Sequence, residues 1–140
     1  MPMIASPVSE GPAAQLRTGV AAASPVWVLL RGMSRESGHW GVFPEHLRHE
    51  LQALRPDVRV ISLDLPGTGA LRRQPSPTQV SAIVDACRAQ LQRQGVSAPV
   101  SVLGMSLGAA VLSDWANRYP AEVDAGVLIN PSLRPFSVAP

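Results

Sequence analysis

The sequence has 140 residues, and 12 basic residues against 10 acidic ones give it a formal net charge of only +2. Hydrophobic residues make up 46% and charged residues 16%, which is typical of a folded domain and not of a disordered chain. The arginines are dispersed along the chain with no lysine among them, so the composition argues against a nucleic-acid partner. No run approaches the ~18 apolar residues of a membrane span, so we expect no membrane association and a cytoplasmic location.

Metal and cofactor sites are not expected. The single cysteine, Cys87, cannot form an internal disulfide, and it is in phase with an apolar helical stripe, which predicts a core position. No group of residues has metal-ligand spacing. The segment GTGALRR lacks the third glycine of a dinucleotide-binding fingerprint, and the chain has no phosphate-binding loop with a Gly-Lys pair.

The chain divides into a leader and one domain. Residues 1–24 are rich in Ala, Pro, Ser and Gly without periodicity, which predicts a flexible leader before a domain over 25–140. Within the domain, short apolar runs predict strands at Val26–Leu30, Val58–Leu63, Val100–Leu103 and Ala125–Ile129. Helical spacing of apolar residues predicts helices over 43–54, 77–94 and 107–119.

Strands that alternate with helices cannot pair through hairpins. We therefore predict an α/β fold, in which about four mostly parallel strands form a sheet with helices on both faces. The loops after the strands then gather at the carboxyl edge of the sheet, which is where such folds carry their chemistry. These loops are RGMSRESGHW, DLPGTG, GMSLG and NPSLRPF.

The segment GMSLG matches the Gly-x-Ser-x-Gly pattern of a nucleophile elbow, with a predicted strand before it and a predicted helix after it. In this interpretation Ser106 is the nucleophile, on a strained turn. Gly104 and Gly108 flank it because larger side chains there would collide with the neighbouring strand and helix. The N–H of Leu107, at the start of the following helix, would then donate to an oxyanion.

Four segments together resemble the α/β-hydrolase superfamily, specifically the compact esterase-like members of bacteria: VWVLLRG, VISLDLPGTG, GMSLG and VLINPSL. The resemblance covers about residues 25–140. It implies a serine hydrolase that acts on a small-molecule acyl ester through an acyl-enzyme. It also implies that Met33 N–H is the second oxyanion donor. The family usually has His-Gly where this chain has Arg31-Gly32, which places a permanent cation near the site, to pair with Glu36 or Asp64.

The partners that would activate Ser106 are harder to place. The family order is Ser, then an acid, then His, yet no histidine follows Ser106, and the acids after it fall on the next helix or at the opposite edge of the sheet. His39 is the one upstream histidine expected on the active edge, whereas His46 and His49 are expected to face solvent. Asp64 either contributes to a substrate edge or caps its own turn, and Trp40 either lines an acyl pocket or packs in the core.

Two hypotheses remain open. In the first, the chain is the amino-terminal part of a serine hydrolase, an incomplete core domain that ends after its fourth strand and lacks the acid and histidine. In the second, it is a catalytically inactive hydrolase-fold fragment that acts only in binding or in self-association. The apolar fourth strand would then offer an unpaired edge to a second copy of the chain.

Overall fold

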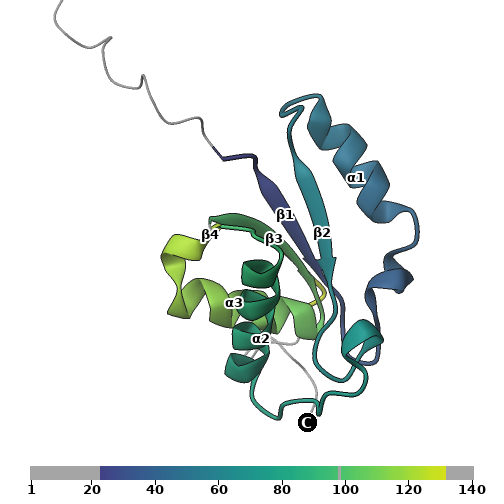
Figure 1. Ribbon diagram of the computed structural model, residues 1–140, viewed down its shortest axis with the longest axis vertical. Coiled ribbons are helices and arrows are strands. Elements are labelled where there is room, and N and C mark those ends of the chain that lie inside the picture. The colour runs from purple at the N-terminus through teal and green to yellow at the C-terminus, as the bar shows by residue number, and fades with distance from the viewer. Residues whose placement is uncertain (1–22, 98, 132–140) are drawn as a thin grey trace, which may run out of the picture.

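The computed structural model describes residues 23–97 and 99–131. Its centre is a sheet of four parallel strands in the order β2-β1-β3-β4 (Figure 1). The strands are β1 (Val26–Leu30), β2 (Arg59–Leu63), β3 (Val100–Met105) and β4 (Val123–Ile129). Because a helix follows each of the first three strands, every connection is a crossover, and the predicted α/β architecture is confirmed.

The three predicted helices are present as α1 (Phe43–Gln52), α2 (Val80–Arg93) and α3 (Leu107–Arg118). The second begins later than predicted because Gln79 still has extended backbone angles, φ −113° and ψ 134°. Three short 3-10 turns were not predicted, since a turn of three or four residues is too short to show apolar periodicity. They are η1 (Ser37–Trp40), η2 (Gly69–Leu71) and η3 (Pro120–Glu122).

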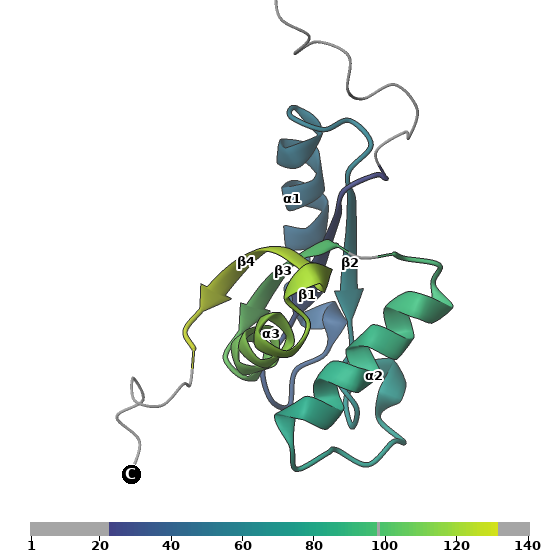
Figure 2. The same ribbon diagram turned by 90° about the vertical axis from the view of Figure 1, so that its left-hand side faces the viewer.

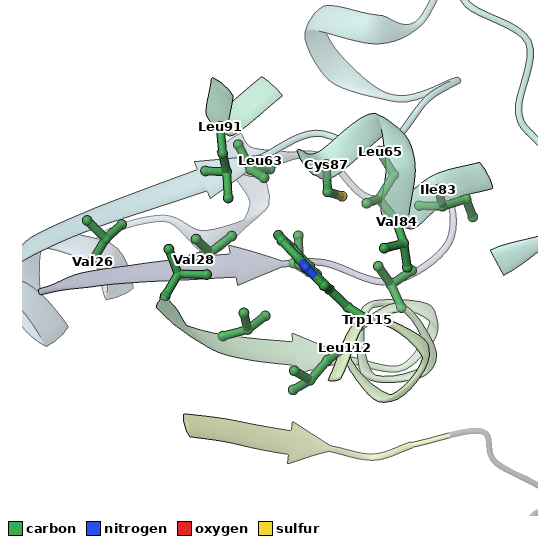
Figure 3. Close-up of a cluster of buried hydrophobic side chains, with 14 residues drawn as sticks. Val26, Val28, Leu63, Leu65, Ile83, Val84, Cys87, Leu91, Leu112 and Trp115 are labelled. Carbon is green, nitrogen blue, oxygen red and sulfur yellow. The ribbon is translucent and has the colours of Figure 1, made fainter. Parts of the chain in front are cut away.

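The side chains of β1 alternate between two apolar clusters, one on each face of the sheet. Val26, Val28 and Leu30 join the larger cluster, with residues of α2 and α3 (Figure 3). Leu29 joins the smaller cluster, with Trp40 and Leu103. Helix α1 lies along β2, apart from the α2–α3 pair (Figure 1), so helices pack on both faces as predicted. Cys87 is fully buried in the larger cluster, and burial raises the pKa of its thiol to about 12.

Strand β4 forms one edge of the sheet and pairs only with β3 among the described residues (Figure 2). Most of its side chains are exposed, including Val127 and Leu128 at 40% and 45%. No helix in the described part of the chain has the length and hydropathy to cross a bilayer. Of the predicted leader, all but its last two residues lie outside the described residues.

A polar cluster joins α2, α3 and η3 at the amino-terminal end of the sheet, far from the carboxyl-edge loops. The Arg88 guanidinium donates two hydrogen bonds to the Glu122 carboxylate, at 2.9 and 2.8 Å, and the indole Nε1–H of Trp115 donates a third, at 2.8 Å. The hydrogen bonds from Arg88 hold the pKa of Glu122 below its ordinary value, although burial opposes them. Arg88 also lies over the ring of Tyr119, 3.6 Å from its centroid.

We expect the Glu122 carboxylate to make stability depend on pH below about 4.5. Because its folded-state pKa is lowered, its contribution is present above the unfolded-state pKa and is lost as pH falls through the folded-state value. Glu122→Gln should lower the free energy of unfolding at pH 7 by about 1–3 kcal/mol and flatten this acid dependence. Urea denaturation at pH 7 and pH 3 measures both effects, and equal acid sensitivity in the variant and the wild type would contradict the assignment.

Candidate functional site

The loops that follow the strands meet at the carboxyl edge of the sheet, as expected. Gly32, after β1, faces Ser106, after β3: a Cβ added at Gly32 would lie 3.1 Å from Ser106 Cβ and 3.6 Å from Ser106 Oγ. Beside them is a cavity of about 170 Å³, lined on one side by residues 32–34 and Leu107 and on the other by residues 65–68 of the loop after β2. The β1, β2 and β3 loops therefore share one small cavity.

Ser106 occupies a strained turn between β3 and α3. Its backbone angles are φ 55° and ψ −114°, a positive φ that side chains other than glycine rarely adopt. Its N–H donates to the carbonyl of Ile129 at 3.0 Å, and its carbonyl accepts from the N–H of Ala109 at 2.9 Å. Ser106 itself is half-buried, so the turn is tied to both β4 and α3 while the residue stays accessible.

The glycines on either side of Ser106 let three backbones approach closely. A Cβ on Gly104 would collide with the backbone of Gly108, and a Cβ on Gly108 would collide with the carbonyl of Leu30 at the end of β1. In each case the obstacle is backbone, which cannot rotate away as a side chain can. The first turn of α3 is thus packed directly on the ends of β1 and β3.

Two backbone amides near Ser106 have no acceptor among the described residues. The backbone hydrogen bonds of residues 23–97 and 99–131 include none donated by Met33 or Leu107. Leu107 is the first residue of α3, where N–H groups lack an intrahelical acceptor and the helix dipole favours negative charge. Met33 follows Gly32 in a turn that the bond from Arg35 N to Gly32 O closes at 3.2 Å.

The Asp64 carboxylate serves to join two loops. One oxygen accepts from the N–H of Ser37 at 2.6 Å, and the other accepts from the N–H of Ala70 at 3.0 Å. Gly69 approaches the same carboxylate so closely, at φ +50°, that a Cβ there would collide with it. These contacts are those of a capping residue, the second of the two roles expected for Asp64 from the sequence.

Arg31 pairs with neither Glu36 nor Asp64, so that expectation was wrong. Its guanidinium instead lies over the ring of Trp40, 4.8 Å from the centroid, and its Nη1 is 3.6 Å from Met105 Sδ. The reason is geometric: both oxygens of Asp64 already accept backbone N–H groups, and Arg31 directly follows a strand whose alternation turns its side chain toward the Trp40 face. Trp40 is only 7% exposed, packed in the smaller core cluster and stacked on Phe43.

The structure brings none of the three histidines into contact with Ser106. His39 accepts a hydrogen bond at Nδ1 from the N–H of Glu36, at 3.0 Å, so its side chain caps the turn η1. His46 and His49 are exposed on α1, as expected. Within the part of the chain that the structure describes, no three His, Cys, Asp or Glu side chains form a group that suits a metal ion.

Two further residues of this edge were not among the candidate site residues expected from the sequence. Ser34 and Asn130, like Ser106, combine a side chain with a positive φ, at 59° and 48°, and the three follow β1, β4 and β3 respectively. No other non-glycine residue of the described ranges has a positive φ, so the strained backbone gathers at the carboxyl edge. The Asn-Pro pair is a turn signal that marks Asn130 in the sequence, whereas nothing local marks Ser34.

A second cavity, of about 330 Å³, lies between α2 and α3 at the opposite end of the sheet. The charged groups that line it include Arg88 and Glu122, which pair with each other. Because Arg88 and Glu122 already bind each other, this cavity has fewer free polar groups for a ligand than the Ser106 edge. We therefore place the candidate site at Ser106.

Comparison with known families agrees with this geometry. The model of the alpha/beta hydrolase family matches residues 27–140, which is most of the chain. The chain belongs to this family. No curated protein is similar enough to the sequence to match it.

Solved structures of hydrolases share the fold. A hydrolase from Pseudomonas aeruginosa is 26% identical, with a TM-score of 0.59 over 82% of this chain and 41% of that one. Rv0554 from Mycobacterium tuberculosis is 21% identical, with a TM-score of 0.62 over 77% and 37%. A marine microorganism esterase is 15% identical, with a TM-score of 0.60 over 76% and 37%. The chain thus spans about two fifths of the length of these three solved proteins.

The close approach at Gly108 predicts a large effect of one methyl group. Gly108→Ala should lower the free energy of unfolding by about 1–3 kcal/mol, because the new Cβ meets the Leu30 carbonyl. Gly38→Ala is the matched control: its Cβ would have only Glu36 Oε1 nearby, at 3.8 Å, and should change stability by less than about 0.5 kcal/mol. Thermal or urea unfolding compares the two, and equal effects would refute the packing argument.

Proposed function

We propose that the chain is a serine hydrolase of the alpha/beta hydrolase family that acts on small-molecule acyl esters through Ser106. The observation that carries the proposal is the strained turn that holds a half-buried serine between β3 and the first turn of α3. A nucleophile on such a turn can reach a carbonyl carbon while the N-terminal amides of the helix face the developing charge.

In this mechanism Ser106 Oγ attacks the acyl carbon, and the carbonyl oxygen becomes an oxyanion. The N–H groups of Met33 and Leu107 are the proposed donors to it, since both lack acceptors in the described structure and both line the cavity beside Gly32. Collapse of the tetrahedral intermediate expels the alcohol and leaves an acyl-Ser106, which water then hydrolyses.

A general base must take the proton of Ser106. His39, the one histidine in the β1 loop, has its Nδ1 engaged by Glu36 N–H and makes no contact with Ser106. We therefore propose that the acid and histidine partners lie outside these 140 residues, in the family order Ser, acid, His. The coverage of only about two fifths of the hydrolases above supports this.

A fluorophosphonate probe tests the nucleophile. Because the general base is proposed to lie outside these residues, modification should be slow, and the turn and the two amide donors should direct it to Ser106. Mass spectrometry should find the adduct on Ser106, and Ser106→Ala should abolish it. Ser113→Ala, which removes a hydroxyl bonded to Ala109 O on α3, is the control and should label as the wild type does. An adduct on another serine, or equal labelling of the Ser106→Ala variant, would overturn the proposal.

A second candidate function, self-association, rests on the exposed edge of β4. Antiparallel pairing with β4 of a second copy about a twofold axis through Gly126 would place Asp124 opposite Leu128 and not opposite another Asp124. It would also cover Leu128 and Val127, which are 45% and 40% exposed. Such pairing would extend the sheet without placing like charges side by side.

Light scattering after size-exclusion chromatography tests this pairing. We expect a dimer at micromolar concentrations that Leu128→Lys converts to a monomer, because the charge would lie in the new strand pair. Leu54→Lys, at a leucine that is 79% exposed beyond α1, is the matched control and should remain dimeric. A wild type that stays monomeric throughout would exclude self-association.

A further inference from the structure

The Arg31 guanidinium is held in place without a counter-ion. The face of Trp40 and the sulfur of Met105 fix it, at 4.8 Å and 3.6 Å. Neither contact neutralises its charge. Among the described residues Arg31 forms no ion pair, and its Nε, like the indole Nε1 of Trp40, is buried without an acceptor. An always-charged group that is partly removed from water and left unpaired is unusual away from a ligand site.

Neither of the nearby acids, Glu36 and Asp64, forms an ion pair with Arg31. Both oxygens of Asp64 accept backbone N–H groups, from Ser37 and Ala70. Glu36 is exposed and lies in no ion pair within the described ranges. The positive end of the α3 dipole lies at the same edge as this unpaired cation, and both attract an anion.

Arg31 and its contact Met105 both lie close to Ser106 along the backbone. Arg31 directly precedes Gly32, which faces Ser106 Oγ, and Met105, which Arg31 contacts, directly precedes Ser106. The Trp40–Arg31 pair therefore lies beside the turn that holds Ser106. Nη2 makes no hydrogen bond within residues 23–97 and 99–131, and so it remains a donor for a ligand at this turn.

We propose that Arg31, positioned by Trp40 and Met105, is a carboxylate-binding subsite beside Ser106, so that the ester substrate carries a carboxylate of its own. The substrate assignment rests on the proposed hydrolase function, but the anion site does not. A single guanidinium matches one carboxylate in charge and in planar geometry. The competing interpretation is that Arg31 only packs on Trp40, and in that case small anions should leave the pair undisturbed.

Succinate, a small dicarboxylate, is a direct probe of the subsite. In ¹H–¹⁵N spectra of the folded chain, the indole signal of Trp40, assigned by loss in Trp40→Phe, should shift saturably as succinate is added. Succinamide, which has the same shape without the charge, should produce no such shift. This comparison needs no variant at Arg31. An indole signal that responds to neither compound, or equally to both, would overturn the proposal.

Two variants test whether Arg31 is the arginine that binds succinate. Arg31→Met should weaken succinate binding at least about tenfold, because it removes the charge and keeps an apolar chain on Trp40. Arg35→Met is the matched control from the same loop: Arg35 is exposed and forms no ion pair in the described structure, so its loss should change the affinity less than about twofold. Equal weakening in the two variants would mean a diffuse charge effect and would contradict a site at Arg31.

The hydrolase proposal and the anion site can fail separately. Bound succinate should slow fluorophosphonate labelling of Ser106 in the wild type, and it should not do so in Arg31→Met. If the probe modifies another residue and not Ser106 while succinate still shifts Trp40, the serine chemistry fails and the anion site stands. If Ser106 is labelled and succinate neither protects it nor shifts Trp40, the hydrolase stands and the carboxylate subsite is wrong.

Discussion

At the turn around Ser106 three stretches of backbone come closer than any side chain would allow. Gly104 leaves room for the backbone of Gly108, and Gly108 leaves room for the carbonyl of Leu30 at the end of β1. This approach lets α3 start directly on the ends of β1 and β3, and it brings the loop after β1 within reach of Ser106. The positions of the serine, of the helix N-terminus and of Met33 all follow from this one packing constraint.

Two carboxylates, those of Asp64 and Glu122, are engaged in contacts that join elements of the fold. Asp64, in the loop after β2, joins η1 to η2 by accepting two backbone N–H groups. Glu122 is the acid with the most hydrogen bonds, and it joins α2 to α3 at the other end of the sheet. Arg31 is therefore left without an ion pair among the described residues, at the same edge as the N-terminus of α3. The Arg88–Glu122 ion pair lies at the opposite end of the sheet from Ser106.

The chain belongs to the alpha/beta hydrolase family, and at one position, Arg31, it departs from the expected pattern. Arg31 stands where the resemblance described above leads one to expect a histidine before Gly32, and the change leaves the Met33 amide in place because that amide belongs to the backbone. What changes is the side chain, which packs on Trp40 in the smaller core cluster. The substitution therefore leaves the backbone of the candidate site intact and changes its charge.

The sequence alone determined the elements and their order. Apolar runs such as VWVLL and helical spacing such as Phe43, Leu47 and Leu51 are local signals, and burial on one or both sides of an element produces them directly. The GMSLG pattern also predicted the turn from sequence alone, because a side chain at either glycine would collide with neighbouring backbone. Local signals of this kind are sufficient to locate the sheet, the helices and the Ser106 turn.

Only the tertiary structure decided how the charged residues pair. The partners of Arg31, Asp64 and Glu122 come from segments 6 to 74 residues away along the chain, and residue spacing carries no information about such contacts. Arg31 had two acids within reach by sequence, yet packing turned it to an indole ring and a thioether while backbone amides took the Asp64 carboxylate. Which charged groups pair depends on which of them the completed fold leaves free. The pairing can therefore be read only from the tertiary structure.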